Sequence, residues 1–167
     1  MNNVKELTYI GTKLIKAKPM TRADYNIYRG WELPSDEDGA DEGFLVEYLD
    51  GGKSNMPDRQ GYVSWSPKDV FDKAYRSTTA LTFGQAIEAL KIGQKVTRAG
   101  WNGKNMFLFL VPGSNFQVNR PPLLGIYEEG TKISYQSHID MKTAQNTVVP
   151  WLASQSDVLA EDWVIVV

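Results

Sequence analysis

The sequence contains no cysteine and a single histidine, His138, among its 167 residues. The absence of cysteine excludes disulfides, thiol nucleophiles and cysteine-ligated zinc sites, and it fits a cytosolic protein. One histidine leaves little imidazole for acid–base chemistry or for metal binding. We therefore expect neither a metal site nor another cofactor.

The chain also lacks long apolar runs and an excess of basic charge. No window approaches the stretch of about 18 apolar residues that crosses a bilayer, and the N-terminus lacks the apolar core of a secretory signal. Lys and Arg total 18 against 20 Asp and Glu, a net charge of −2, which argues against general affinity for polymeric nucleic acid or membrane surfaces. These absences favour a cytoplasmic protein that binds neither polymeric nucleic acid nor membranes.

A polar break at residues 77–80 predicts a linker between two small units. Residues 1–76 have the pattern of a β-rich accessory module with two short helices, one of them over 22–29. This module has few apolar residues for a large core, so we expect it to rest on the second unit or on a partner. Five carboxylates between Asp36 and Glu42 do not have the spacing of an EF-hand loop, which favours a solvated acidic loop over a calcium site.

Residues 81–167 combine helix signals with several short strand patterns. Thr82-Phe-Gly-Gln85 is a capping box ahead of an apolar stripe, which predicts a helix. The run 105–111 is apolar on both faces, as in the central strand of a sheet. Gly125–Tyr127 and Lys132–Tyr135 flank a turn signal and predict a hairpin. We expect an α+β fold, mainly antiparallel β-sheet with a few short helices.

The loop Arg98-Ala-Gly-Trp101-Asn-Gly103 lies between two of these strand patterns. Gly100 and Gly103 flank Trp101, so little in the local sequence screens the indole. A base that stacks on an aromatic ring gains about 1–3 kcal/mol. The residues alone leave two interpretations open, because Trp101 is equally well a core or edge tryptophan whose N–H bonds a carbonyl.

Polar side chains that suit ligand binding occupy other predicted loops and strand ends, where binding sites tend to lie. They are Arg98, Asn102, Lys104, Asn119, Arg120, Asp140, Thr143, Gln155 and Asp157. No Gly-rich nucleotide motif or Gly-x-Ser-x-Gly elbow accompanies them. His138 and Asp140 share one face of a predicted strand, but a polar strand face is the simpler interpretation. We therefore expect no catalytic residue.

Several motifs of the second unit occur together in a recognisable order. They include Val96-Thr-Arg-Ala-Gly-Trp-Asn-Gly103, Val118-Asn-Arg-Pro-Pro-Leu123, His138-Ile-Asp-Met-Lys-Thr-Ala144 and Val149-Pro-Trp-Leu-Ala-Ser-Gln-Ser-Asp157. Over about residues 81–167 the chain closely resembles the second Thoeris anti-defence family of phage proteins. Residues 1–76 resemble an accessory module of other phage proteins, for which we expect a small SH3-like barrel.

The family resemblance implies a sponge rather than an enzyme. Similar proteins form homotetramers that sequester cyclic ADP-ribose isomers made by TIR-domain defence proteins, and some also hold cyclic dinucleotides of CBASS defence. The resemblance implies that Trp101 stacks a base or ribose and that Arg120 meets a phosphate. Asp140, Thr143, Gln155 and Asp157 match motif positions of the family and are candidates to contact ribose hydroxyls or base edges, but the match assigns no role to each one. The alternatives are a hydrolase of such signals and a phage structural or interaction protein.

Overall fold

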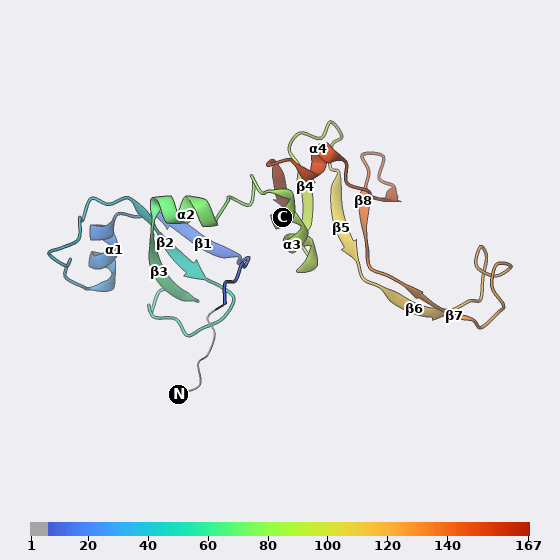
Figure 1. Ribbon diagram of the computed structural model, residues 1–167, viewed down its shortest axis with the longest axis horizontal. Coiled ribbons are helices and arrows are strands. Elements are labelled where there is room, and N and C mark those ends of the chain that lie inside the picture. Colours follow the sequence, from blue (N-terminus) through green and yellow to red (C-terminus); the bar gives the residue numbers. More distant parts are fainter. Residues whose placement is uncertain (1–6) are drawn as a thin grey trace. The chain divides into compact units, whose positions relative to one another are not determined.

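The computed structural model describes residues 7–167, which divide into two compact units, one ending at Arg76 and one beginning at Ser77. Within the described residues, each unit combines antiparallel strands with two short helices (Figure 1). The expected α+β class with mainly antiparallel sheet is therefore confirmed. No helix in this part of the chain is both long enough and apolar enough to cross a membrane.

The first unit is an open three-stranded antiparallel sheet, in the order β1-β2-β3, between two helices. Tyr25 of α1 packs against Leu45 and Val63 on one face, and Phe71 of α2 stacks on Phe44 on the other. In place of the expected SH3-like barrel, the described strands stay open because a helix already covers each face. The elements are β1 (Ile15–Pro19), α1 (Arg22–Arg29), β2 (Gly43–Tyr48), β3 (Tyr62–Pro67) and α2 (Lys68–Ala74).

The second unit contains a five-stranded antiparallel sheet in the order β10-β4-β5-β8-β9, with β5 at the centre as its apolar sequence predicted. Ala86 and Leu90 of α3 pack on Val96, Leu108 and Trp163, all of them buried. The elements are α3 (Phe83–Lys91), β4 (Lys95–Arg98), β5 (Phe107–Val111), β6 (Ser114–Gln117), β7 (Lys132–Tyr135), β8 (His138–Lys142), β9 (Val148–Pro150), α4 (Gln155–Val158) and β10 (Trp163–Val166).

The face of this sheet opposite α3, here called the open face, is only partly buried. Phe107, Phe109 and Val111 alternate with Leu108 along β5, so they point away from the core that Leu108 fills. Lys95 and Lys142 place their ammonium groups 5.3 and 6.0 Å from the centre of the Phe107 ring. The open face is therefore apolar along β5, with cations beside it.

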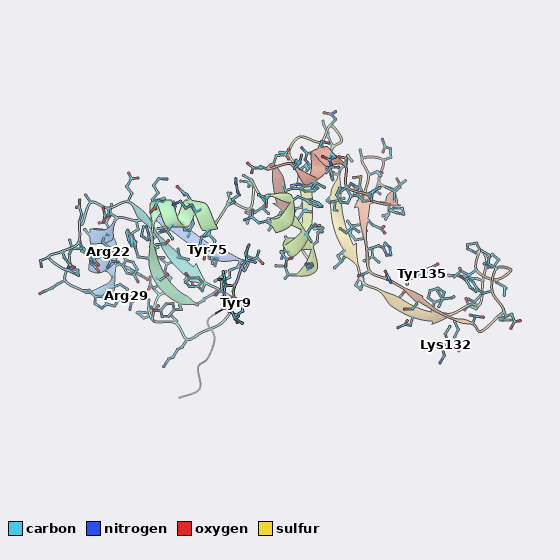
Figure 2. All side chains as sticks on the ribbon, viewed as in Figure 1. Tyr9, Arg22, Arg29, Tyr75, Lys132 and Tyr135 are labelled. Carbon is cyan, nitrogen blue, oxygen red and sulfur yellow. The ribbon has the colours of Figure 1, made fainter. Side chains whose placement is uncertain are left out.

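Strands β6 and β7 form a two-stranded arm, residues 112–137, whose register continues that of β5 and β8 without a shift. Figure 1 shows the arm running on from the ends of β5 and β8, and Figure 2 marks Lys132 and Tyr135 at the two ends of β7. The expected hairpin of Gly125–Tyr127 with Lys132–Tyr135 is wrong. β7 pairs with β6 instead, and 125–127 belongs to the arm tip.

Candidate functional site

The short helix α4 has a reciprocal hydrogen-bonded cap that fixes the carboxylate of Asp157. The Ser154 hydroxyl accepts a hydrogen bond from the Asp157 N–H at 3.1 Å. In return, the Ser154 N–H and hydroxyl donate to Asp157 Oδ2 at 3.1 and 2.6 Å. This is a capping box with aspartate at its third position. Oδ2 is thereby fully engaged, and Oδ1 points to the loop that follows β4.

Arg98, at the end of β4, joins α4 to the start of β10. Its Nη1 donates to Asp157 Oδ1 at 2.9 Å and its Nε to Asp162 Oδ1 at 2.8 Å. The second oxygen of Asp162 accepts the Gly100 N–H at 2.8 Å. A Cβ at position 100 would lie 2.8 Å from that same oxygen, so glycine is what lets the loop approach. The Arg98 guanidinium and the two carboxylates hold the 98–103 loop in place.

Trp101 lies on this network rather than standing free. Its indole N–H donates to Asp157 Oδ1 at 3.3 Å, and its ring meets Trp163 edge-on, with ring centres 5.6 Å apart. The side chain is half-buried, in contrast to the exposed indole that its flanking glycines suggested. Trp101 is therefore held in one orientation with part of its surface left to solvent.

The electrostatics of the cluster favour its ionised form. Burial would raise the pKa of Asp157, but hydrogen bonds from Ser154, Arg98 and Trp101 outweigh this and lower the pKa to about 2. The hydrogen bond from Arg98 is the main cause of a lowered pKa at Asp162. The two carboxylates in turn raise the pKa of Arg98, with Asp162 contributing most. Arg98, Asp157 and Asp162 therefore stay charged at neutral pH, and their ion pairs support the 98–103 loop.

Of the residues that the sequence singled out, the structure brings three into direct contact: Arg98, Trp101 and Asp157. Asn102 is exposed on the same loop, and Gln155 is exposed on the first turn of α4. These five side chains form the candidate site. Arg98 donates to two carboxylates, and these hydrogen bonds hold the loop in position.

Lys104, directly after this loop, is exposed. The other predicted residues lie elsewhere in the second unit. Thr143 accepts the Thr147 N–H in the turn after β8, at 3.2 Å. Asn119 and Arg120 are exposed in the arm tip. In the part of the chain that the structure describes, Thr143, Asn119 and Arg120 make no hydrogen bond or ion pair with the Trp101 loop, so their roles remain predictions.

Asp140 points to the open face, paired across the sheet with Phe109 on one side and Pro150 on the other. Its Oδ1 is buried and has no hydrogen-bond partner among the described residues. The imidazole Nε2 of His138 lies 3.8 Å from Oδ1. A buried carboxylate oxygen without a donor is costly, which makes Asp140 a ready acceptor for an incoming N–H or O–H group.

Asp162 and Ser154 are part of the cluster, and the sequence pattern did not single them out. Ser154-x-x-Asp157 has the spacing of a capping box, so Ser154 was open to recognition as a helix start. Asp162 contacts Arg98, 64 residues away in sequence. Only the pairing of β4 with β10 brings them together, and no local pattern predicts that pairing.

Comparison with known proteins assigns the second unit to a family. Residues 81–166 match the model of the Tad2-like family, described as the Thoeris anti-defense 2-like domain. The chain is also 46% identical over 88 residues to a protein of Bacillus phage SP01 named Thoeris anti-defense 2. That match covers 53% of this chain and 97% of the phage protein. The motifs that carry the resemblance, including the Trp101 loop, lie within the matched residues. This chain belongs to the Thoeris anti-defense 2-like family.

Proposed function

We propose that this protein counters Thoeris defence by binding cyclic ADP-ribose-type signals and holding them without degrading them. The family membership supports the anti-defence role. The observation that carries the binding role is the fixed Trp101 indole, oriented by Asp157 and Trp163 on a loop that Arg98 holds. The protein would act in the cytosol of the infected bacterium, where the signals are made.

The candidate site offers a preformed stacking surface with polar groups beside it. Stacking of a base on the Trp101 indole contributes about 1–3 kcal/mol. The exposed amides of Asn102 and Gln155 present both donors and acceptors to base edges or ribose hydroxyls. A rigid indole loses little freedom on binding, so more of the stacking energy appears as affinity.

Sequestration rather than cleavage is supported by the state of the charged groups. The carboxylates of Asp157 and Asp162 accept hydrogen bonds from Arg98 and have lowered pKa values. They are therefore poor proton acceptors at neutral pH. The cluster suits the positioning of a ring, not the transfer of a proton.

A useful sponge needs more than one tryptophan, and we propose that sites form between copies of this chain. A dissociation constant below 1 μM requires about −8 kcal/mol, which one stacking contact does not supply. A single two-stranded hairpin is marginally stable in water, yet the arm carries exposed Ile126, Tyr127 and Tyr135. Its packing on a second copy would cover these side chains.

Such packing would also bring the exposed Asn119 and Arg120 to a neighbouring chain. We propose a homotetramer with closed symmetry, the assembly that the family resemblance implies. Arginine at the arm tip can hold a phosphate with two parallel hydrogen bonds. We extend the proposal to cyclic dinucleotides of CBASS defence as a second class of ligand, because they too present bases and phosphates.

Mass spectrometry of the small molecules that co-purify with the protein tests this function. The full chain would be purified from cells that express an active TIR enzyme and from cells with an inactive one, then denatured. A cyclic ADP-ribose isomer that appears only with the active enzyme is the expected result. Its absence from protein purified with the active enzyme would contradict the proposal.

One observation favours a second candidate, a hydrolase of the same signals. His138 and Asp140 lie 3.8 Å apart, and Asp140 Oδ1 has no hydrogen-bond partner among the described residues. Conversion of the signal by the wild-type chain, lost in His138→Ala, would support this candidate. The sponge proposal expects no conversion by either protein.

A further inference from the structure

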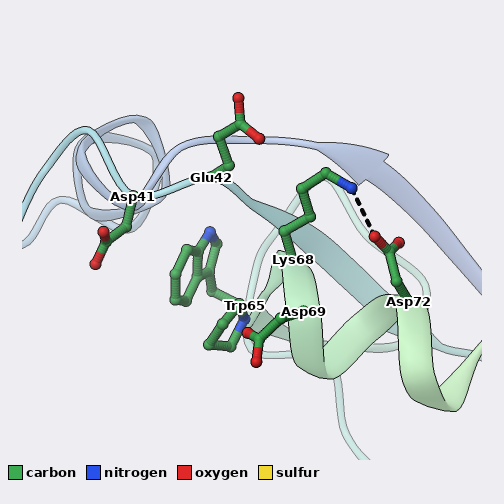
Figure 3. Close-up of a pocket in the computed structure, with 7 residues that line it drawn as sticks. Asp41, Glu42, Trp65, Lys68, Asp69 and Asp72 are labelled. Carbon is green, nitrogen blue, oxygen red and sulfur yellow. Dashed lines mark hydrogen bonds and ion pairs between the residues drawn. The ribbon is translucent and has the colours of Figure 1, made fainter.

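The first unit contains a hollow of about 490 Å³, which shares no residue with the proposed nucleotide site. It lies where the loop before β2 meets the end of β3 and the first turns of α2 (Figure 3). Its lining includes an indole, four carboxylates and one ammonium group, from Asp41, Glu42, Trp65, Lys68, Asp69 and Asp72. Carboxylates alone usually form a solvated surface; here they surround an aromatic ring.

The indole of Trp65 is fixed in this hollow. Its N–H donates to the Met20 carbonyl at 2.9 Å. Gly43 packs so closely on the ring that a Cβ there would lie 2.4 Å from two ring atoms. The guanidinium carbon of Arg22 lies 5.0 Å from the ring centre, so the chain itself already places one guanidinium at this indole. An aromatic face attracts a cation through its quadrupole.

The charges around the ring are only partly neutralised. Lys68 pairs with Asp72 at 2.6 Å, and Lys73 pairs with Asp69 at 3.6 Å. Arg22 is engaged by two hydrogen bonds to Glu37. Among the described residues, Asp41 and Glu42 form no ion pair within 4.0 Å, although Arg22 and Lys68 lie near enough to feel their respective charges. In Figure 3 the side chains of Asp41 and Asp69 lie on either side of the indole, with Glu42 above it. An excess of negative charge therefore faces the hollow.

We propose that this hollow binds an organic cation, a guanidinium or alkylammonium group on an alkyl chain. A guanidinium fits best, because it stacks on aromatic rings, is weakly hydrated and pairs with carboxylates through two parallel bonds. The source is an arginine side chain of a polypeptide or a free polyamine. Cyclic nucleotide signals are anionic and are repelled here, so this site is separate from the one at Trp101.

The test is an NMR titration of the full chain, with 15N in its tryptophan indoles. The probes are a capped arginine-glycine-arginine peptide, the same peptide with neutral citrulline in place of arginine, and spermidine. We expect the arginine peptide to shift the indole N–H signal of Trp65, assigned with Trp65→Phe, and the citrulline peptide to leave it unmoved. A shift with spermidine alone would identify a polyamine as the source.

Two charge-matched double variants show whether the cation binds to the hollow itself or is attracted by the overall negative charge of the protein. Asp41→Asn with Glu42→Gln removes two charges that line the hollow. Glu32→Gln with Asp36→Asn removes two exposed charges outside it. We expect the first pair to weaken binding by about fivefold and the second by less than about twofold. Equal losses in both pairs, equal binding of the citrulline peptide, or no binding of either cation would overturn the proposal.

Discussion

Asp157 holds the candidate site together because it accepts hydrogen bonds at both of its oxygens. Ser154 donates to Oδ2, while Arg98 and Trp101 share Oδ1. The backbone carbonyl of the same residue accepts the Trp163 indole N–H at 3.0 Å. One buried aspartate thus links helix α4, the loop after β4 and the core.

We predict that Asp157 makes stability depend on pH in the acid range. Its pKa is about 2 in the folded chain and about 3.9 when unfolded, so folding favours the ionised form. The resulting stabilisation, about 2 to 3 kcal/mol, is complete above about pH 5 and is lost progressively as the pH falls toward about 1.

Urea unfolding of wild type and Asp157→Asn between pH 2 and pH 6 measures this contribution. The difference in free energy of unfolding should shrink by about 2 kcal/mol toward pH 2. A difference that stays constant over this range would show that the carboxylate charge does not stabilise the fold.

A second residue-scale prediction concerns Trp101. Trp101→Ala removes the stacking surface and should weaken binding of a cyclic ADP-ribose isomer about tenfold or more. Trp101→Phe keeps an aromatic face but loses the N–H that Asp157 accepts, so its loss should be smaller. Calorimetric titration measures both, with Trp31→Ala in the first unit as the control. Unchanged affinity in Trp101→Ala would mean that this tryptophan is only a core residue.

At the scale of elements, local signals predicted starts and stops well. Helix α1 spans Arg22–Arg29 as expected, because Thr21 caps its start and Gly30, at φ +69°, ends it. The Thr82–Gln85 capping box is likewise confirmed. These caps depend on residues within one helical turn of each other, so they can be recognised from the local sequence.

Pairing between distant segments was not predictable in the same way. The turn signal at Glu128-Glu-Gly130 is real, since the Thr131 N–H donates to the Glu128 carbonyl at 3.1 Å. It closes the tip of the arm instead of joining two adjacent strands. The register of β6 with β7 is inherited from β5 and β8, which lies outside any local window. The contact of Arg98 with Asp157 was hidden for the same reason.

Gly113 lies at the joint where β5 passes into the arm, and we predict that it is needed there. A Cβ at this position would lie 2.7 Å from the Tyr135 carbonyl oxygen, a backbone atom that cannot easily move. Gly113→Ala should therefore loosen the arm while the core of the second unit stays folded.

Hydrogen exchange at the Val118 and Gly130 amides reports on the arm, because both amides are bonded across it. We expect these amides to exchange about tenfold faster in Gly113→Ala than in wild type. This means that the free energy of opening the arm is about 1.4 kcal/mol lower. Gly84→Ala, where a Cβ meets nothing closer than 4.0 Å, is the control. Equal protection in Gly113→Ala and wild type would contradict this role for Gly113.

At the scale of the whole molecule, the arm and the open face leave apolar surface for a second copy. We predict that replacing residues 114–135 with an Asn-Gly turn, which suits a two-residue hairpin, lowers the oligomeric state. Light scattering should then give less than four times the 18.8 kDa of one chain, while Arg120→Ala keeps the tetramer. A tetramer without the arm, or a monomeric wild type, would contradict the proposed assembly.

The division into two units frames the central claim, because the family match begins at residue 81 and the phage relative is matched over 97% of its length. The proposed nucleotide binding therefore belongs to the second unit, and the proposed cation binding to the first.

The most direct measurement is recovery of the signal after binding. Full-length protein in excess is incubated with a cyclic ADP-ribose isomer, freed of unbound ligand and then heated to unfold it. Sequestration predicts that the isomer, quantified by mass spectrometry, returns intact and in the amount bound. A linear or hydrolysed product, or no retained ligand at all, would contradict it.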